Sequence, residues 1–247
     1  MNPSHIGHPP DLLAAERHYL VRWGWPQVGL VGAAAAAGSA GLGLLAARHS
    51  ALWLLLLVPL AAASGLSVLF FRNPGRRIPA ELGVLLAPAD GRVVEVATVE
   101  EPEYLGGRAL KVGIFLSIFD VHLNRAPCSG RVEYLRRRPG RFLDARNPRS
   151  SRENEAQAVG IRRDDSGGPP GVKVLVRQVA GAIARRIICP LREDQPVERG
   201  RLLGMIKYGS RTELLVSTPP GGRAPEVQVR LGDHVAAGET VLYRYPS

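Results

Sequence analysis

The sequence has 247 residues, of which 45% are hydrophobic and 22% charged, and its formal net charge is +10. This length allows one ordinary domain with an additional element, or two small domains, and the composition excludes an intrinsically disordered chain. The two cysteines, Cys128 and Cys189, are too few for a disulfide framework and too far apart for a C-x-x-C metal site.

The first predicted elements are two membrane-spanning helices at 28–47 and 51–71, preceded by a polar segment, 1–27, without a signal-peptide pattern. Neither run contains a charged residue, and each reaches the length of about 20 residues that a helix needs to cross a bilayer. Only Arg48, His49 and Ser50 separate them, which predicts a tight hairpin over 28–71. A single bent helix in a soluble core is the alternative, but apolar runs of this length are rare there.

Arginines flank the predicted hairpin on both sides, whereas its loop offers only Arg48. The flanking arginines are Arg17, Arg22, Arg72, Arg76 and Arg77. A hairpin returns the chain to the side from which it entered, and the positive-inside rule then predicts that both flanks are cytoplasmic. We therefore expect a protein of the cell (inner) membrane whose polar domain lies on the cytoplasmic face.

Residues 72–247 are expected to form a mostly β domain, a β-rich α+β arrangement. Short strand-like runs recur between Pro- and Gly-containing turns, and polar and apolar residues alternate strictly at 172–177 and 226–231. A short helix is predicted near 151–158.

His122 is the candidate general base of this domain. It follows the apolar strand-like run 110–119 and lies two residues after Asp120. A histidine in such a position more often has a structural role than a catalytic one. The domain's other histidine, His234, is predicted to be an exposed residue in a turn between two strands. The sequence contains no metal-ligand cluster, phosphate-binding loop or dinucleotide fingerprint, so we expect no metal.

Six short motifs occur in a consistent order within a region of similarity that runs from about residue 70 to residue 216. They are Phe-Phe-Arg-Asn-Pro at 70–74, Ala-Pro-Ala-Asp-Gly-Arg at 87–92, Phe-Asp-Val-His-Leu-Asn-Arg-Ala-Pro at 119–127, Glu-Asn-Glu at 153–155, Ala-Arg-Arg-Ile at 184–187 and Gly-Met-Ile-Lys-Tyr-Gly-Ser-Arg at 204–211. Each motif is weak alone, but jointly they resemble the phosphatidylserine decarboxylase proenzymes of the short bacterial and archaeal type.

The resemblance implies that the chain cuts itself between Gly209 and Ser210. The Ser210 hydroxyl would attack the Gly209 carbonyl and convert the amide to an ester. Elimination would then leave a dehydroalanine, which tautomerises and loses ammonia on hydrolysis to give a pyruvoyl group. The products would be a β chain, 1–209, and an α chain, 210–247, which remain together as a heterodimer.

The implied activity is decarboxylation of phosphatidylserine to phosphatidylethanolamine in phospholipid biosynthesis. The pyruvoyl cofactor, formed from Ser210, would be the electron sink, and a ketone built into the chain explains the missing cofactor fingerprint. The expected partners are the membrane and an anionic serine phospholipid. An ether-linked (archaetidyl) serine lipid is an alternative substrate, because it differs only in its tails.

The resemblance also suggests roles for individual residues. Asp90 matches an Asp that assists the cleaving serine together with a histidine, and His122 matches the first histidine of an Asp-x-His-x-x-His pattern. Arg125 replaces the second histidine, so either His122 serves both self-cleavage and decarboxylation or another group assists cleavage. Arg125 and Arg211 are candidate ligands for the substrate carboxylate or phosphate, with surface charge an equal alternative.

Two other classes of protein compete with this interpretation. Residues 231–239 resemble half of a biotinyl- or lipoyl-carrier domain, but none of Lys111, Lys173 and Lys207 lies in a suitable hairpin turn. The second alternative is a membrane-anchored basic scaffold without enzymatic activity. We expect no nucleic-acid partner, because the aromatic content is only 6% and no recognition module is evident.

Overall fold

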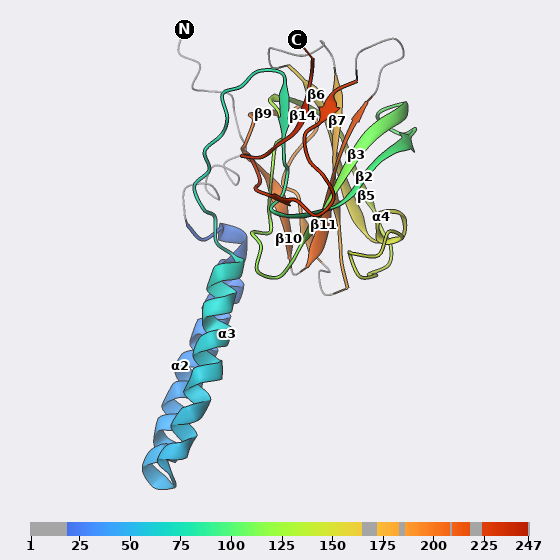
Figure 1. Ribbon diagram of the computed structural model, residues 1–247. Coiled ribbons are helices and arrows are strands. Elements are labelled where there is room, and N and C mark those ends of the chain that lie inside the picture. The colour runs from blue at the N-terminus through green and yellow to red at the C-terminus, as the bar shows by residue number, and fades with distance from the viewer. Residues whose placement is uncertain (1–18, 165–171, 183–185, 208, 218–223, 247) are drawn as a thin grey trace. The chain divides into compact units, whose positions relative to one another are not determined.

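The computed structural model describes residues 19–246 except 165–171, 183–185, 208 and 218–223 (Figure 1). Tyr208 and the Ala-Arg pair at 184–185, which belong to the motifs above, lie outside the described residues. The described chain separates into two compact units. One is helical and ends at Pro74, and the other begins at Gly75 and contains the strands.

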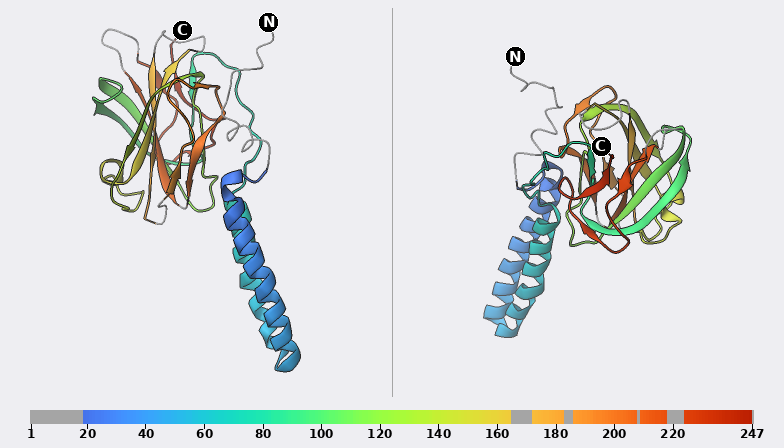
Figure 2. Two further views of the ribbon diagram at one scale, coloured as in Figure 1. Left: turned by 180° about the vertical axis from the view of Figure 1, so that it is seen from behind. Right: turned by 45° about the horizontal axis from the view of Figure 1, so that its top comes forward.

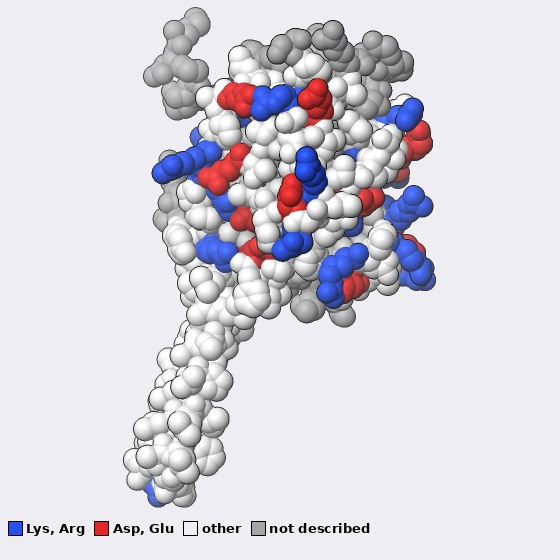
Figure 3. Space-filling model, in the orientation of Figure 1, with Lys and Arg blue, Asp and Glu red and all other residues white. Residues whose placement is uncertain are grey.

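The helical unit contains two apolar helical segments, each long enough to span a membrane. It consists of η1 (Arg22–Gly24), α2 (Trp25–Arg48), η2 (Ala51–Leu56) and α3 (Leu57–Phe70). Small residues let the segments approach closely, since a Cβ at Gly38 would lie 3.2 Å from a methyl carbon of Leu60. The surface of this unit is uncharged in Figure 3 except at its tip, and the charged residue between Arg22 and Arg72 is Arg48, at the end of α2. The prediction of two N-terminal apolar helices is confirmed.

The second unit is mostly β, as predicted, and contains one short helix, α4 (Ser150–Glu153), among its described residues. Its strands are β1 (Val84–Leu86), β2 (Gly91–Glu101), β3 (Gly107–Leu116), β4 (Leu123–Arg125), β5 (Gly130–Arg138), β6 (Ala156–Arg163), β7 (Lys173–Val179), β8 (Arg186–Ile188), β9 (Pro196–Val197), β10 (Leu202–Lys207), β11 (Ser210–Ser217), β12 (Glu226–Val227), β13 (His234–Val235) and β14 (Val241–Arg244).

In the described residues these strands form three antiparallel sheets. The largest is curled and has the order β13-β2-β3-β11-β7-β6-β5-β9 (Figure 2). The two smaller sheets have the orders β1-β14-β12 and β4-β10-β8. Antiparallel neighbours of this kind need only short connections, which agrees with the turn-rich sequence.

Strand β11 lies in the interior of the large sheet, between β3 and β7. Its first residue, Ser210, is opposite Leu116 of β3, and Arg211 is opposite Val179 of β7. Residues 210–216 are all buried, so both faces of this strand are covered. Because side chains alternate along a strand, Ser210 and Thr212 point to one face and Arg211 and Glu213 to the other.

Candidate active site

The predicted cleavage bond lies in the connection between β10 and β11. Gly209 has φ 62°, in the left-handed region that favours glycine. Ser210 is fully buried, and its Oγ has no hydrogen-bond partner among the described residues. Buried hydroxyl groups are normally hydrogen-bonded, so an unpartnered one calls for a functional explanation.

His122 lies directly beside this bond, in the loop between β3 and β4. Its Nε2 accepts a hydrogen bond from the backbone N–H of Gly209 at 3.0 Å, and its Nδ1 is 3.0 Å from the carbonyl oxygen of Asp120. A carbonyl can only accept and an N–H can only donate, which assigns the ring proton to Nδ1. Nε2 is therefore unprotonated and faces Gly209, at the predicted cleavage bond.

The loop that carries His122 is fixed by a carboxylate. Asp120 Oδ2 accepts hydrogen bonds from the backbone N–H and the hydroxyl of Ser117, both at 2.7 Å, and the backbone N–H of Asp120 donates to the Ser117 carbonyl. The side chain of Asp120 thus closes the turn, while its carbonyl orients the imidazole. Its part in the turn was not evident from the sequence, where it was noted only as a carboxylate near His122.

Asp90 lies in the turn that precedes β2 and has two partners for its carboxylate. Arg76 donates to Oδ2 at 2.7 Å, and the backbone N–H of Ala237 donates to Oδ1 at 2.7 Å. A Cβ on the next residue, Gly91, would come within 2.1 Å of the Phe115 carbonyl oxygen, so this turn requires glycine. Sequence reasoning missed Arg76, which it counted only as flanking charge.

The two predicted substrate-binding arginines lie in different surroundings. Arg125 is buried and donates to the Gly200 carbonyl at 2.8 Å. Arg211 is 1% exposed and donates to Glu213 at 2.8 Å and to Glu95. Because the Arg211 guanidinium already has carboxylate partners, the geometry gives no support to a role in substrate binding, which stays a prediction.

Glu213 is the centre of this buried ion network. It is fully buried and paired with Arg211, Lys111 and Arg177. Burial by itself raises the pKa of the Glu213 carboxyl. The three neighbouring cations together lower this pKa by more than burial raises it, so the net shift is downward. The carboxylate therefore stays ionised inside the sheet.

Neutral polar side chains hold the opposite face of β11. Asn124 of β4 donates to the Thr212 hydroxyl at 2.9 Å, and Gln178 of β7 donates to Asn124 Oδ1 at 2.6 Å. These bonds fasten β4, and with it the end of the His122 loop, to the strand that begins with Ser210.

A cavity of about 200 Å³ adjoins the cleavage bond. Its lining residues are Phe115, Ser117, Ile118, Asp144, Ala145, Arg146, Ala182 and Gly209. Arg146 and Asp144 form an ion pair of 2.6 Å there. The Gly209 carbonyl oxygen packs against Gly181, where a Cβ would be only 2.2 Å away, so the carbonyl of the predicted cleavage bond needs this second glycine.

Comparison with known proteins identifies the family. The model of the family described as phosphatidylserine decarboxylase matches residues 64–243. This chain belongs to the phosphatidylserine decarboxylase family. The prediction that it is a decarboxylase, a carboxy-lyase, is thereby confirmed, as is the family suggested by the motifs.

Several relatives named phosphatidylserine decarboxylase proenzyme support this result. The protein of Symbiobacterium thermophilum is 43% identical over 93% of this chain and 97% of its own length. That of Nitrosomonas eutropha is 38% identical over 99% of this chain and 100% of its own. That of Rhodopirellula baltica is 43% identical over 78% of this chain and 77% of its own.

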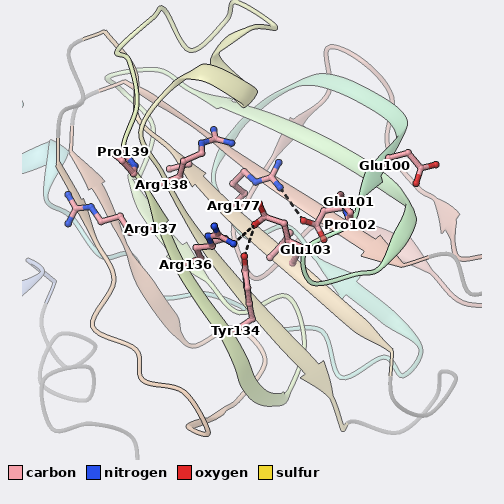
Figure 4. A pocket seen from close by; sticks show the side chains of 13 residues that line it. Glu100, Glu101, Pro102, Glu103, Tyr134, Arg136, Arg137, Arg138, Pro139 and Arg177 are labelled. Atoms are coloured by element: carbon pink, nitrogen blue, oxygen red, sulfur yellow. Dashed lines mark hydrogen bonds and ion pairs between the residues drawn. The ribbon is translucent and has the colours of Figure 1, made fainter.

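This decarboxylase-family chain has a second cavity, of about 280 Å³, between the loop after β2 and strands β5, β6 and β7 (Figure 4). Its lining contains none of the predicted site residues. Several of its polar side chains already pair with one another: Arg136 and Tyr134 with Glu103, and Arg177 with Glu101. We therefore assign the candidate site to the smaller cavity, beside Gly209.

No group of three or more His, Cys, Asp or Glu side chains suited to a metal ion occurs in the described part of the chain. Of the residues predicted for the site, the structure brings His122 and the Gly209–Ser210 bond together. It gives Asp90 other partners, and it directs Arg211 to the opposite face of β11 from Ser210.

Proposed function

We propose that this protein cuts itself between Gly209 and Ser210 and then decarboxylates phosphatidylserine to phosphatidylethanolamine. The observation that carries the proposal is the buried Ser210 hydroxyl, which lacks a hydrogen-bond partner among the described residues and begins β11 directly after Gly209. A hydroxyl without a described hydrogen-bond partner, at the bond that the motif resemblance predicts to be cleaved, suits a nucleophile better than a structural group.

In the proposed cleavage, Ser210 Oγ attacks the carbonyl carbon of Gly209. The hydroxyl proton passes to the unprotonated Nε2 of His122, and the Ser210 nitrogen takes up a proton as the C–N bond breaks. The product is an ester between Gly209 and Ser210 Oγ. Loss of the Ser210 α-proton then expels the Gly209 carboxylate and leaves dehydroalanine, which with one water gives the pyruvoyl group and ammonia.

The residues at this position fit such a cofactor. Ser210 Oγ takes part in no hydrogen bond among the described residues, so its removal would break none of them. The neighbouring Gly209 lines a cavity of about 200 Å³. The pyruvoyl group would supply an electrophilic ketone that accepts the electron pair released when carbon dioxide leaves. In this proposal His122 Nε2 holds or delivers the proton for the former α-carbon. Arg146 contacts the anionic headgroup, because its side chain, although paired with Asp144, is largely exposed at the cavity, whereas that of Arg211 is buried.

The proposed fragments, 1–209 and 210–247, are expected to remain together. After cleavage β11 would still be hydrogen-bonded to β3 and β7, and β14 to β1, all of them strands of the larger fragment. A buried strand with two neighbours does not leave a sheet without unfolding it. This supports a heterodimer of the two self-cleavage fragments.

The intact mass of the purified protein tests the proposal. The wild type should yield two fragments, the smaller with a blocked residue 210, and should form phosphatidylethanolamine from phosphatidylserine in lipid nanodiscs. Ser210→Ala should remain one chain without this activity, because it lacks the nucleophile. The matched control is Ser217→Ala, at the other end of β11, which should be cut and active. An uncut wild type, or an active Ser210→Ala protein, contradicts the proposal.

A further inference from the structure

The loop beside the candidate site exposes apolar side chains. Phe119 is 70% exposed and Ile118 is 39% exposed, and Ile118 also lines the cavity that contains Gly209. Exposed apolar residues are common singly, but these two are adjacent and lie at the entrance to a site. Both residues belong to the turn in which the Asp120 carboxylate accepts hydrogen bonds from Ser117. These hydrogen bonds fix the backbone of the turn that exposes the two side chains.

An exposed cation lies at the same end of the domain. Arg186 of β8 is exposed and is opposite Lys207 of β10, which is buried and lies two residues before Gly209. The backbone N–H of Ile206 donates to the His122 carbonyl at 3.2 Å, which joins this end of β10 to the loop of Phe119.

We propose that three exposed residues, Ile118, Phe119 and Arg186, form a lipid-docking rim, the Phe119 rim, that contacts the headgroup region of an anionic bilayer. The inference rests on the proposed function, since it supplies the route by which a phospholipid headgroup reaches the cavity. The substrate's acyl chains stay in the membrane, so the cavity entrance must meet the membrane surface for the headgroup to enter.

The chemistry of the rim fits a lipid surface better than a protein partner. Exposed apolar side chains together with an exposed cation at the same end of a domain are a combination that suits the interface of an anionic membrane. A stable protein interface buries about 800 Å² on each partner. Two exposed apolar side chains are too few for the core of such an interface, but they are enough for shallow contact with a bilayer.

Fluorescence quenching tests the contact directly. The full chain would carry Phe in place of Trp23, Trp25 and Trp53, and a single tryptophan introduced by Phe119→Trp. The control is Leu231→Trp in the same background, because Leu231 is also exposed, at 65%, and lies in another turn of the domain. In nanodiscs of brominated anionic lipid, we expect the fluorescence of Phe119→Trp to fall about threefold more than that of Leu231→Trp. Equal quenching at the two positions overturns the proposal.

A rate ratio separates failure of the rim from failure of the proposed function. We would measure decarboxylation of phosphatidylserine in nanodiscs and of a soluble short-chain phosphatidylserine. Phe119→Ser should lower the ratio of the first rate to the second about fivefold, because the rim matters only at a bilayer. Leu231→Ser should leave the ratio unchanged. If the wild type is inactive on both substrates but Phe119→Trp is still quenched more than Leu231→Trp, the proposed function is refuted and the rim is supported. An active wild type with an unchanged ratio in Phe119→Ser refutes the rim.

Discussion

His122 is held by an acceptor on one side and a donor on the other. The Asp120 carbonyl fixes the proton on Nδ1, and the Gly209 N–H lies against Nε2. Complete burial excludes competing water from the ring. A histidine held in one tautomer by backbone groups presents the same unprotonated nitrogen to the predicted cleavage bond in every copy of the chain.

We therefore predict that His122→Ala slows self-cleavage by about 10²- to 10⁴-fold, the usual contribution of a general base. The fraction of precursor cut over time, read on a denaturing gel, gives the rate. His234→Ala is the matched control, because His234 is the other histidine of the domain and is exposed beside Arg92. It should be cut at the wild-type rate.

The same assay tests the role suggested for Asp90. If Asp90 assists the cleavage, then Asp90→Ala should also accumulate as precursor, whereas Asp233→Ala, in the turn before β13, should not. Precursors of His122→Ala and Asp90→Ala that are still fully cut would show that these roles are wrong.

At the scale of elements, β11 combines two environments in one strand. One face carries Ser210 and the neutral network of Asn124 and Thr212, and the other carries the ion network around Glu213. The charges lie on the face opposite Ser210, where the carboxylates balance the cations. This arrangement makes part of the stability of the strand dependent on the ionisation of Glu213.

We predict a corresponding loss of stability in acid. The folded-state pKa of Glu213 is lowered, so its contribution is complete above the ordinary glutamate pKa of about 4.3 and is lost as the pH falls through the folded-state value. In the uncut Ser210→Ala background, Glu213→Gln should lower the free energy of unfolding at pH 7 by about 3 kcal/mol, because the cations lose their buried partner. It should also weaken the dependence on pH below about 4.3.

Denaturant titrations of the full chain at several pH values measure both effects. Glu226→Gln, at an exposed position of β12, should change neither the free energy of unfolding nor its dependence on pH. A Glu213→Gln protein as stable as its parent, with the same loss in acid, would mean that the network does not support the strand.

The elements differ in how far the sequence could predict them. The two apolar helices and the mostly β domain follow from hydropathy and turn residues alone. The helix predicted at 151–158 is shorter, and α4 ends at Glu153 because β6 begins at Ala156 and pairs with β5 and β7. The alternation at 226–231 yields only the two-residue β12, since local pattern does not determine which partner strand is available.

The candidate site, too, could be predicted only in part from the sequence. Motif resemblance selected Gly209, Ser210 and His122, but the tautomer of His122 depends on the Asp120 carbonyl, which no motif describes. Arg76 and Ala237 reach Asp90 across long sequence separations. The burial of Arg211 follows from the pairing of β11 with β3 and β7, which pairs residues distant in sequence.

At the scale of the whole molecule, the chain joins an apolar hairpin to a charged domain. Between Arg22 and Arg72 the only charged residue is Arg48, at the end of α2. Both helical segments are long enough to span, and a pair of spanning segments returns the chain to the side where it started. The distribution of arginines then decides the sidedness, because cationic loops are retained in the cytoplasm.

We accordingly predict that the hairpin tip faces outward and the β domain faces the cytoplasm. A cysteine introduced by Ser50→Cys, between α2 and η2, should react with a membrane-impermeant maleimide in intact cells. One introduced by Leu231→Cys, exposed in the β domain, should react only after the cells are lysed. The parent protein measures the background from Cys128, which is buried, and from Cys189, which is partly buried. Labelling of Leu231→Cys but not of Ser50→Cys in intact cells would reverse the orientation and exclude a cytoplasmic site.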